Sequence, residues 1–198
     1  MYLASTGTYS TSPYFQIAGG ITLGNSGLTI AAWFRTSSSG TWGRIIEFSN
    51  GPNSDEILVS VNPWGSGQLA CVVQTTTSTP MTTDLVVNDN TWRHFAWTIS
   101  SDGTWKVYIN GLSYETNAGQ PYPRNILRLN AWIGKSIFST DSPFNGYIDD
   151  FRVYNSVLSD SDIYTLYSTT ATGIDILSRF IIMKIQIYYY VSAELTSF

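Results

Sequence analysis

Residues 27–36 read GLTIAAWFRT, and this stretch decides the fold class because its side chains divide into two sets by alternation. In an extended strand, successive side chains point to opposite faces of a sheet, so a period of two gives each face its own set. One face carries Leu28, Ile30, Ala32 and Phe34, and the other carries Thr29, Ala31, Trp33 and Arg35. The stretch therefore predicts a strand with one face in an apolar core.

The same period recurs along most of the chain, and turn-forming sequences separate the runs. Asp102-Gly103 and Asn110-Gly111 favour tight hairpins, because these residues accept positive φ angles at low cost. Roughly ten to twelve short strands with frequent turns are typical of a sandwich or jelly roll. We therefore predict an all-β fold, a two-sheet antiparallel β-sandwich of the jelly-roll type. Its further β-rich runs are residues 44–49, 56–62, 68–75, 92–99, 104–109, 112–116, 127–134 and 147–154.

One short helix follows the last of these runs. Ser159 and Asp162 have the spacing of a capping box, in which each side chain bonds to the other residue's backbone N–H. The pattern predicts a helix near residues 159–167. The sandwich with this helix is expected to form one domain over residues 1–168.

The remaining residues, 169–198, are predicted to be a C-terminal extension with a different character. Residues 179–191 read RFIIMKIQIYYYV, a run that is too short and too charged for a membrane-spanning helix. Alternation, low charge and the absence of proline predict an extra strand. An unpaired strand of this kind would aggregate, so we expect it to pair. It would pair either within its own domain or with a neighbouring subunit of a homo-oligomer or particle.

Composition excludes several functional classes. The net charge is −4 and no basic stripe occurs, so nucleic acid is not expected as a partner. Cys71 is the only cysteine and His94 the only histidine, which excludes an intrachain disulfide and a cysteine-based zinc site. Residues 1–6 lack the features of a signal peptide, and no N-x-[ST] glycosylation sequon occurs. We expect exposure at an extracellular surface or in a virus particle.

The order of motifs resembles the laminin G-like jelly-roll domains of the concanavalin A-like lectin/glucanase superfamily. The resemblance covers about residues 1–168, and the last motif is its most specific part. It implies two antiparallel sheets, carbohydrate or protein binding, and in many members a structural calcium ion. The motifs are LTIAAWFR (28–35), RIIEFSNG (44–51), WRHFAWTISSDGTWKVYINGL (92–112), WIGKS (132–136) and FNGYIDDFRVYNSVLSDSDIYTLY (144–167).

The resemblance to glucanases also raises the question of catalysis, and the sequence argues against it. The glucanase relatives carry carboxylates at alternate strand positions as E-x-D-x-E, which this chain lacks. Glu47 and Glu56, like the other glutamates, are separated by long stretches of chain. His94 lies within a strand pattern, and the resemblance implies a structural, hydrogen-bonding histidine there. We therefore expect the protein not to be an enzyme.

Two kinds of binding residue remain. The resemblance implies that Asp149, with Asp150 as a weaker second ligand, could hold calcium together with backbone carbonyl oxygens. Trp42 and Trp64 lie in Gly/Ser-rich loops, where a buried role is less automatic, and Tyr122 is a further aromatic candidate. These three are the predicted ligand-binding residues.

Two functions stay open on the sequence alone. The first is a non-catalytic binding or adhesion module for a carbohydrate or protein ligand. The alternative is a structural subunit of a virus particle, such as a capsid, fibre or decoration protein, that assembles through its jelly roll. The lectin-like resemblance favours the first, and the low charge and apolar C-terminal run favour the second.

Overall fold

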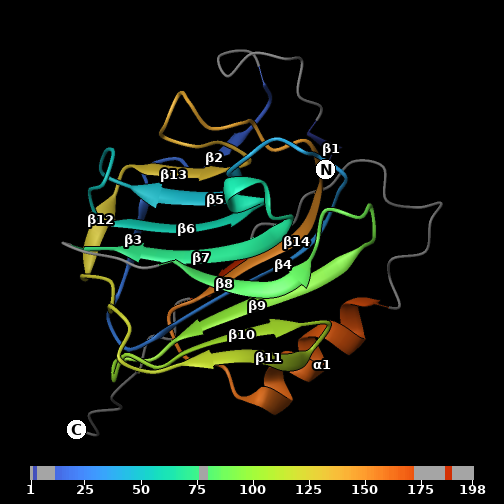
Figure 1. The fold of residues 1–198 in the computed structure, drawn as a ribbon. Coiled ribbons are helices and arrows are strands. Elements are labelled where there is room, and N and C mark those ends of the chain that lie inside the picture. The colour runs from blue at the N-terminus through green and yellow to red at the C-terminus, as the bar shows by residue number, and fades with distance from the viewer. Residues whose placement is uncertain (1, 4–11, 76–79, 172–185, 189–198) are drawn as a thin grey trace, which may run out of the picture.

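Two stacked sheets form the body of the computed structural model, which describes residues 2–3, 12–75, 80–171 and 186–188 (Figure 1). The first, which we call the front sheet, has the order β2 (Phe15–Gln16), β13 (Asn130–Ile133), β5 (Gly43–Ser49), β6 (Glu56–Val61), β7 (Gln68–Gln74) and β8 (Met81–Val86). The second, the back sheet, has the order β1 (Tyr2–Leu3), β14 (Gly146–Tyr154), β4 (Leu28–Thr36), β9 (Arg93–Ile99), β10 (Trp105–Ile109) and β11 (Leu112–Asn117). Neighbours in these orders pair antiparallel, which confirms the predicted sandwich.

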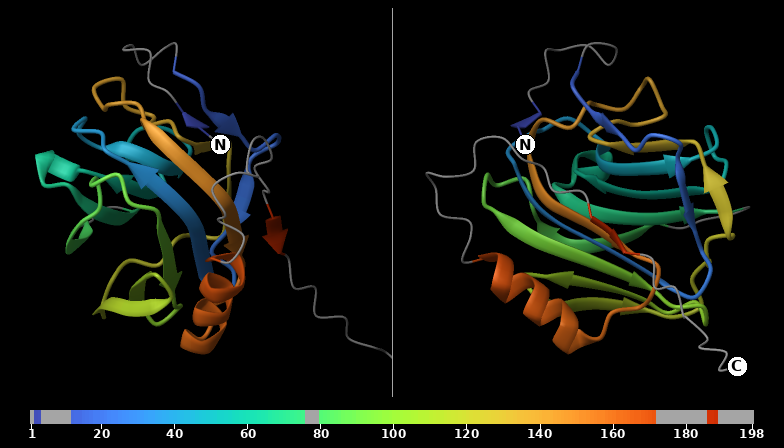
Figure 2. Two further views of the ribbon diagram at one scale, coloured as in Figure 1. Left: turned by 90° about the vertical axis from the view of Figure 1, so that its right-hand side faces the viewer. Right: turned by 180° about the vertical axis from the view of Figure 1, so that it is seen from behind.

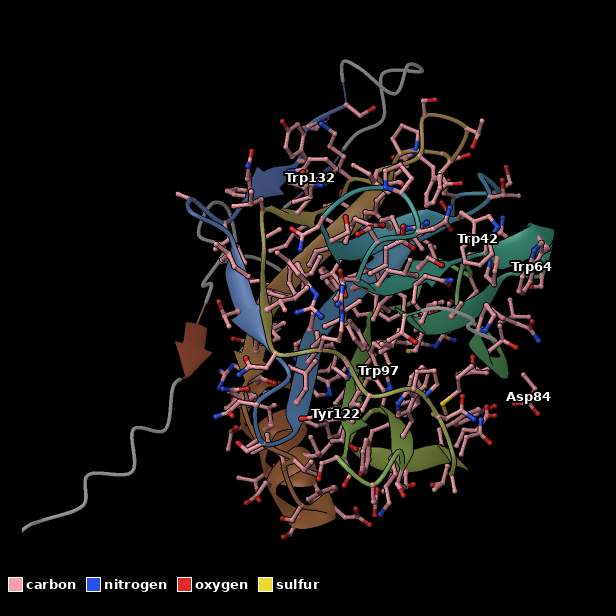
Figure 3. All side chains as sticks on the ribbon, turned by 90° about the vertical axis from the view of Figure 1, so that its left-hand side faces the viewer. Trp42, Trp64, Asp84, Trp97, Tyr122 and Trp132 are labelled. Carbon is pink, nitrogen blue, oxygen red and sulfur yellow. The ribbon has the colours of Figure 1, made fainter. Side chains whose placement is uncertain are left out.

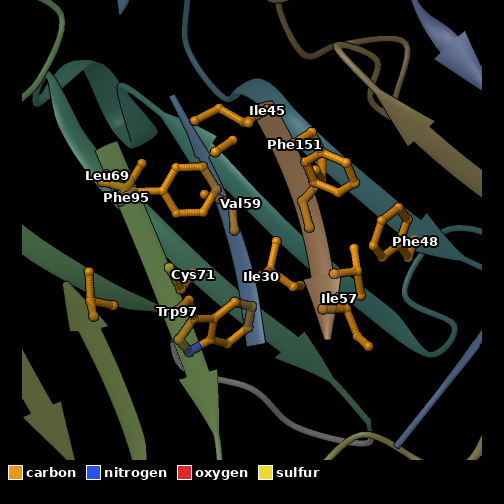
Figure 4. Packing of buried hydrophobic residues seen from close by; sticks show 14 of the residues in the cluster. Ile30, Ile45, Phe48, Ile57, Val59, Leu69, Cys71, Phe95, Trp97 and Phe151 are labelled. Atoms are coloured by element: carbon orange, nitrogen blue, oxygen red, sulfur yellow. The ribbon is translucent and has the colours of Figure 1, made fainter. Parts of the chain in front are cut away.

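The core lies between the sheets and uses the inward-facing residues of both (Figure 4). Alternation along each strand supplies these residues, and each fully buried aliphatic side chain contributes about 1.5–3 kcal/mol. The core-facing side chains labelled in Figure 4 include Ile30, Phe95 and Trp97 from the back sheet and Ile57, Val59 and Cys71 from the front sheet, all at most 1% exposed.

The predicted turns have the expected backbone conformations. Asn110 and Gly111 have φ angles of +51° and +78°, which is the hairpin geometry that both residues tolerate. The hairpin at Asp102-Gly103 closes through a hydrogen bond from the Gly103 N–H to the carbonyl oxygen of Ser100. These turns fix the register of β9, β10 and β11.

Helix α1 (Asp160–Ala171) covers the outer face of the back sheet (Figure 2). Ile163 and Leu166 pack against Ala31, Ala96 and Tyr108, and the two alanines leave room for a close approach. No helix in the described ranges is long and apolar enough to cross a bilayer.

The helix begins as the sequence predicts. The Asp162 carboxylate accepts the Ser159 N–H at 3.1 Å, and the Ser159 hydroxyl oxygen accepts the Asp162 N–H at 3.1 Å. This is the reciprocal capping box. The helix ends at Ala171, beyond the predicted limit of 167.

A small two-stranded sheet of β3 (Ile21–Leu23) and β12 (Ile126–Arg128) joins distant parts of the chain at one end of the sandwich. Arg128 is 1% exposed and its guanidinium donates to several backbone oxygens. They belong to Asp55 (2.7 Å), Arg124 (3.0 Å), Leu23 (3.2 Å) and Ile126 (3.2 Å). One buried side chain therefore ties three segments together.

Only part of the predicted C-terminal strand falls in the described residues. Residues 186–188 form β15 (Gln186–Tyr188), which pairs parallel with β14 of the same chain. Residues 179–185 and 189–191 lie outside the described residues. The prediction that the whole run 179–191 forms a strand therefore stays a prediction.

Candidate functional site

Two of the predicted ligand-binding residues meet beside the front sheet. Trp42 precedes β5, and Trp64 lies in the 3-10 helix η1 (Pro63–Gly65). Their rings contact edge to face with centroids 4.9 Å apart, and Trp64 keeps 65% of its surface exposed. Figure 3 shows both labelled side chains on the same side of the molecule. The fold therefore brings these two residues together and leaves one ring open to solvent.

The backbone around the pair is held in conformations that non-glycine residues rarely adopt. The φ angle is +57° at Trp42, +56° at Asn62 and +51° at Trp64. Asn62 fixes the loop by donating to the carbonyl oxygen of Ser39 at 2.8 Å and accepting the Gly67 N–H at 2.6 Å. Such residues cost about 1–3 kcal/mol each and concentrate at binding sites. These hydrogen bonds hold the backbone that places Trp64 beside Trp42.

A cavity of about 240 Å³ opens beside Trp42 on the outer face of the front sheet. This is slightly below the range of about 300–1,000 Å³ for ligand pockets, which suits one sugar ring or one group of a longer ligand. Strands β5, β6 and β7 contribute Arg44, Glu56, Leu58, Val72 and Gln74. The segment between β13 and β14 contributes Phe138, Thr140 and Asp141.

Arg44 organises the charges at this cavity. Its Nε lies 3.0 Å from Oε2 of Glu47, and its Nη2 lies 2.9 Å from Oδ2 of Asp141. Its Nη1 donates to the carbonyl oxygen of Trp42 at 3.1 Å, and the guanidinium lies 5.2 Å from the centre of the Trp42 ring. The arginine thereby fixes Trp42 and the Asp141 segment against β5.

Glu47 lies next to Arg44 on β5 and opposite Leu58 of β6, both of which line the cavity. It is fully buried, and its Oε1 has no hydrogen-bond partner within the described part of the chain. Burial raises the pKa of this carboxyl from 4.5 to about 7, although Arg44 opposes the shift. The site therefore holds a carboxyl group that titrates near neutral pH.

Glu56 faces the cavity from β6. Its side chain is nearly buried, and its Oε1 accepts the Asn53 N–H at 2.6 Å. No other hydrogen bond reaches this side chain from the described residues. Burial raises the Glu56 pKa, the Asn53 N–H and Arg44 lower it, and Asp141 adds a smaller upward effect.

Sequence reasoning missed this charged cluster. Glu47 and Glu56 are distant by chain count, but β5 pairs antiparallel with β6 and Glu47 lies opposite Leu58. Glu56 shares the face of Leu58, because it lies two residues earlier on the same strand. The only local signal for this cluster was that β5 and β6 each carry an acidic residue at a position facing away from the core. The pairing of β5 with β6, which brings Glu47 and Glu56 close together, was not predicted.

Tyr122, the third predicted ligand-binding residue, lies elsewhere. Its hydroxyl oxygen accepts the Gly27 N–H at 2.7 Å, and its ring packs against the main core. Figure 3 shows it well apart from Trp42 and Trp64. The structure therefore gives Tyr122 a structural role and does not bring it to the cavity.

The predicted calcium ligands, Asp149 and Asp150, lie on β14, and the carboxylate of each accepts a hydrogen bond from the protein itself. Arg152 Nε donates to Oδ1 of Asp150 at 3.0 Å, and Asp149 Oδ1 accepts the Asp150 N–H at 2.9 Å. The register of β14 shifts after Asp149, where Asp150 has a φ of +48°. No group of three or more acidic, histidine or cysteine side chains suited to a metal occurs in the described ranges. Arg152 therefore binds one oxygen of Asp150, the weaker of the two candidates, and calcium binding at Asp149 stays a prediction.

His94 is buried among aromatic side chains. Its ring packs against Trp33 and Tyr167, with centroids 5.4 and 6.0 Å away. Its Nδ1 has no hydrogen-bond partner among the described residues, and burial lowers its pKa from 6.5 to about 3. Aromatic packing, and not hydrogen bonding at Nδ1, holds this residue.

Comparison with known families agrees with this architecture. A laminin G family profile, described as the concanavalin A-like lectin/glucanases superfamily, matches residues 9–164. The chain belongs to this superfamily. A sequence search of curated proteins gave no significant match. The expected resemblance is therefore confirmed at the level of the superfamily.

Several solved protein structures resemble this fold at low sequence identity. A heptameric SAP-like pentraxin from Limulus polyphemus has a TM-score of 0.64 at 16% identity, covering 84% of this chain and 79% of the pentraxin chain. Domain 4 of the Geobacillus stearothermophilus arabinanase AbnA, in complex with arabinotriose, has a TM-score of 0.63 at 22% identity (75% and 69% covered). The Ruminococcus gnavus IT-sialidase CBM40, bound to α2,3 sialyllactose, has a TM-score of 0.61 at 16% identity (81% and 100% covered). At these identities the likeness establishes the lectin-type fold.

Proposed function

We propose that the chain is a non-catalytic carbohydrate-binding module whose ligand contacts Trp64, Trp42 and the adjoining cavity. The observation that carries the proposal is the 65% exposed ring of Trp64, held on a fixed loop next to that cavity. Aromatic side chains offer large apolar faces at little entropic cost, and sugar rings present C–H faces that stack on them. The polar lining would then hydrogen-bond sugar hydroxyl groups.

Two structural neighbours support a saccharide over a protein ligand, since they were solved with arabinotriose and sialyllactose. A saccharide ligand is also consistent with a location at an extracellular surface or on a virus particle, and we propose that location for this protein. Assembly through residues 179–191 has less support, because residues 186–188 pair with β14 of their own chain.

The absence of catalysis is part of the proposal. Glu47 has the raised pKa that a general acid needs, but it is fully buried, does not line the cavity, and is bonded to Arg44. A retaining glycosidase needs two carboxyl groups about 5–5.5 Å apart on either side of the scissile bond, both in reach of substrate. We expect no hydrolysis of a panel of β-glucans and arabinans.

The test of binding is a Trp64→Ala variant on a glycan array. We expect the wild type to bind at least one saccharide saturably, and the variant to bind it about tenfold or more weakly, as an aromatic hot spot implies. Because Trp64 is largely exposed, its loss should leave the melting temperature nearly unchanged.

Tyr164→Ala is the matched control, because Tyr164 is 53% exposed on α1, far from the cavity. It should bind like the wild type. No saturable binding to any saccharide, or equal binding by the wild type and Trp64→Ala, would refute the module.

A further inference from the structure

The cavity beside Trp42 carries an excess of negative charge. Arg44 is the only cation among the described residues that line it, whereas Glu56 and Asp141 are both lining carboxylates. A third carboxyl group, that of Glu47, pairs with Arg44 at 3.0 Å. Both partners of Arg44, Glu47 and Asp141, are themselves acidic. The local balance of charge is therefore acidic.

Arg44 is not free to receive an anionic ligand. Each of its three guanidinium nitrogens already contacts an oxygen of Glu47, Asp141 or Trp42. The side chain is 3% exposed. An incoming carboxylate would have to displace one of these contacts, and it would meet like charges on Glu56 and Asp141.

Glu56 has acceptor capacity that the protein leaves unused. Glu56 is only 3% exposed, and it lines the cavity. The Asn53 N–H donates to its Oε1, which leaves Oε2 without a hydrogen bond from the described residues. A carboxylate offers about four lone-pair sites, so Oε2 can accept a further donor. A buried carboxylate is stabilised most by a charged donor.

The aromatic groups favour the same kind of ligand. Trp42 and Phe138 line the cavity and Trp64 adjoins it, and aromatic faces attract cations within about 6 Å. Arg44 already lies 5.2 Å from the centre of the Trp42 ring. Exposed Trp64 remains available for the face of a sugar ring.

We propose that the cavity binds saccharides that carry a free, protonated amine, with the ammonium group on Glu56 and the sugar ring on Trp64. This inference rests on the proposed carbohydrate-binding function and names its ligand class. The acidic lining selects against sialylated and other anionic glycans by charge repulsion. Neutral sugars would bind at the same place without the ammonium contact to Glu56.

The test compares three probes by calorimetry at pH 6, where the amines of a glucosamine oligomer are mostly protonated: a β-1,4-glucosamine tetramer, its fully N-acetylated counterpart and sialyllactose. Acetylation removes the charge and keeps the ring, so the first two probes differ mainly in the ammonium groups. We expect the free-amine tetramer to bind about tenfold more tightly than the acetylated one, and sialyllactose to bind most weakly.

Glu56→Gln is the decisive variant. The glutamine Oε1 can still accept the Asn53 N–H, so the loop is retained while the charge is lost. The variant should lose most of the preference for the free amine. Asp141→Asn is a second variant should the first fail to fold. Asp102→Asn makes the same charge change in a distant exposed hairpin and should keep the full preference, which controls for general attraction of amines to an acidic protein.

The outcomes separate this inference from the function on which it rests. Equal affinity for the two tetramers, a preference unchanged in Glu56→Gln, or tighter binding of sialyllactose overturns the amine assignment and leaves the carbohydrate module standing. No binding of these probes or of any saccharide on the array overturns both.

Discussion

Glu47 shows most directly how the environment of a single side chain determines its chemistry. It lies fully buried beside Arg44, with one carboxylate oxygen bonded and the other without a partner in the described residues. Folding raises its pKa from 4.5 to about 7, so the folded protein holds a proton there that the unfolded chain releases. The group therefore links stability to pH.

The sign of this linkage leads to a prediction for Glu47→Gln. Between pH 4.5 and about 7 the folded state binds more protons at Glu47 than the unfolded state, so this group makes the free energy of unfolding fall as pH rises. The glutamine still accepts from Arg44 but does not titrate. The stability of the variant relative to the wild type should therefore increase with pH across this window, by at most about 1.4 kcal/mol per pH unit.

Denaturant unfolding of both proteins at a series of pH values measures this difference. The stability of the variant must be compared with that of the wild type at each pH, because buried His94 changes the free energy of unfolding with pH in the opposite direction. Its pKa falls from 6.5 to about 3 on folding, so its contribution to stability grows as pH rises through that range. A stability difference that is constant with pH would contradict the assignment to Glu47.

From residue types alone, the two tryptophans could be named as candidate binding residues, but the acidic residues at the cavity could not. Trp42 and Trp64 were predicted because large aromatic side chains in Gly/Ser-rich loops have less reason to be buried. Glu47, Glu56 and Asp141 have no such local signal, because their roles come from strand pairing and from a distant segment lying over the sheet. Tyr122 has the same residue type as a binding aromatic, yet its hydroxyl bonds to Gly27.

Among the elements, α1 depends on a seam of small residues in the back sheet. Ile163 is fully buried against Ala31 and Ala96. Ile163→Ala should leave a cavity there and lower the free energy of unfolding by about 2–5 kcal/mol. Tyr164→Ala, on the exposed side of the same helix, should change it by less than about 0.5 kcal/mol. Chemical denaturation followed by circular dichroism compares them, and equal effects would contradict the packing of α1.

Element prediction succeeded where one pattern ran undisturbed. The helix start at Ser159 and the alternation of β4 are local signals, and both are observed. The run 127–134 was predicted as one strand but divides into β12 and β13, which pair with different partners. Strand β8 was not predicted, since its sequence MTTDLV mixes polar and apolar residues at an edge position.

At the scale of the whole molecule, Arg128 links segments that are far apart in the sequence. Its buried guanidinium bonds to carbonyl oxygens near residues 23, 55 and 124. Burial lowers its pKa from 12.5 to about 10, with Asp55 opposing the shift, so it remains charged at neutral pH. Such a junction cannot be read from local patterns, because every partner is a backbone group.

Arg128→Met should therefore destabilise the entire sandwich. It leaves several buried carbonyl oxygens without donors, and we expect a loss of about 3–5 kcal/mol in the free energy of unfolding. Lys106→Met removes a cation from an exposed pair with Asp160, 3.2 Å apart, and should cost at most about 1 kcal/mol. Thermal melts of the two variants give the comparison, and similar melting temperatures would contradict the role of Arg128.

The helix and the cavity lie on opposite outer faces of the sandwich, one behind the back sheet and the other before the front sheet. The face that carries α1 is therefore free to serve for attachment, while the opposite face carries the proposed binding site. Molecules tethered to a surface through a group placed at Tyr164 would all turn their tryptophan pair toward the surrounding fluid. A dense layer of them would present many shallow sites in one orientation, so that weak single contacts could add up to firm adhesion.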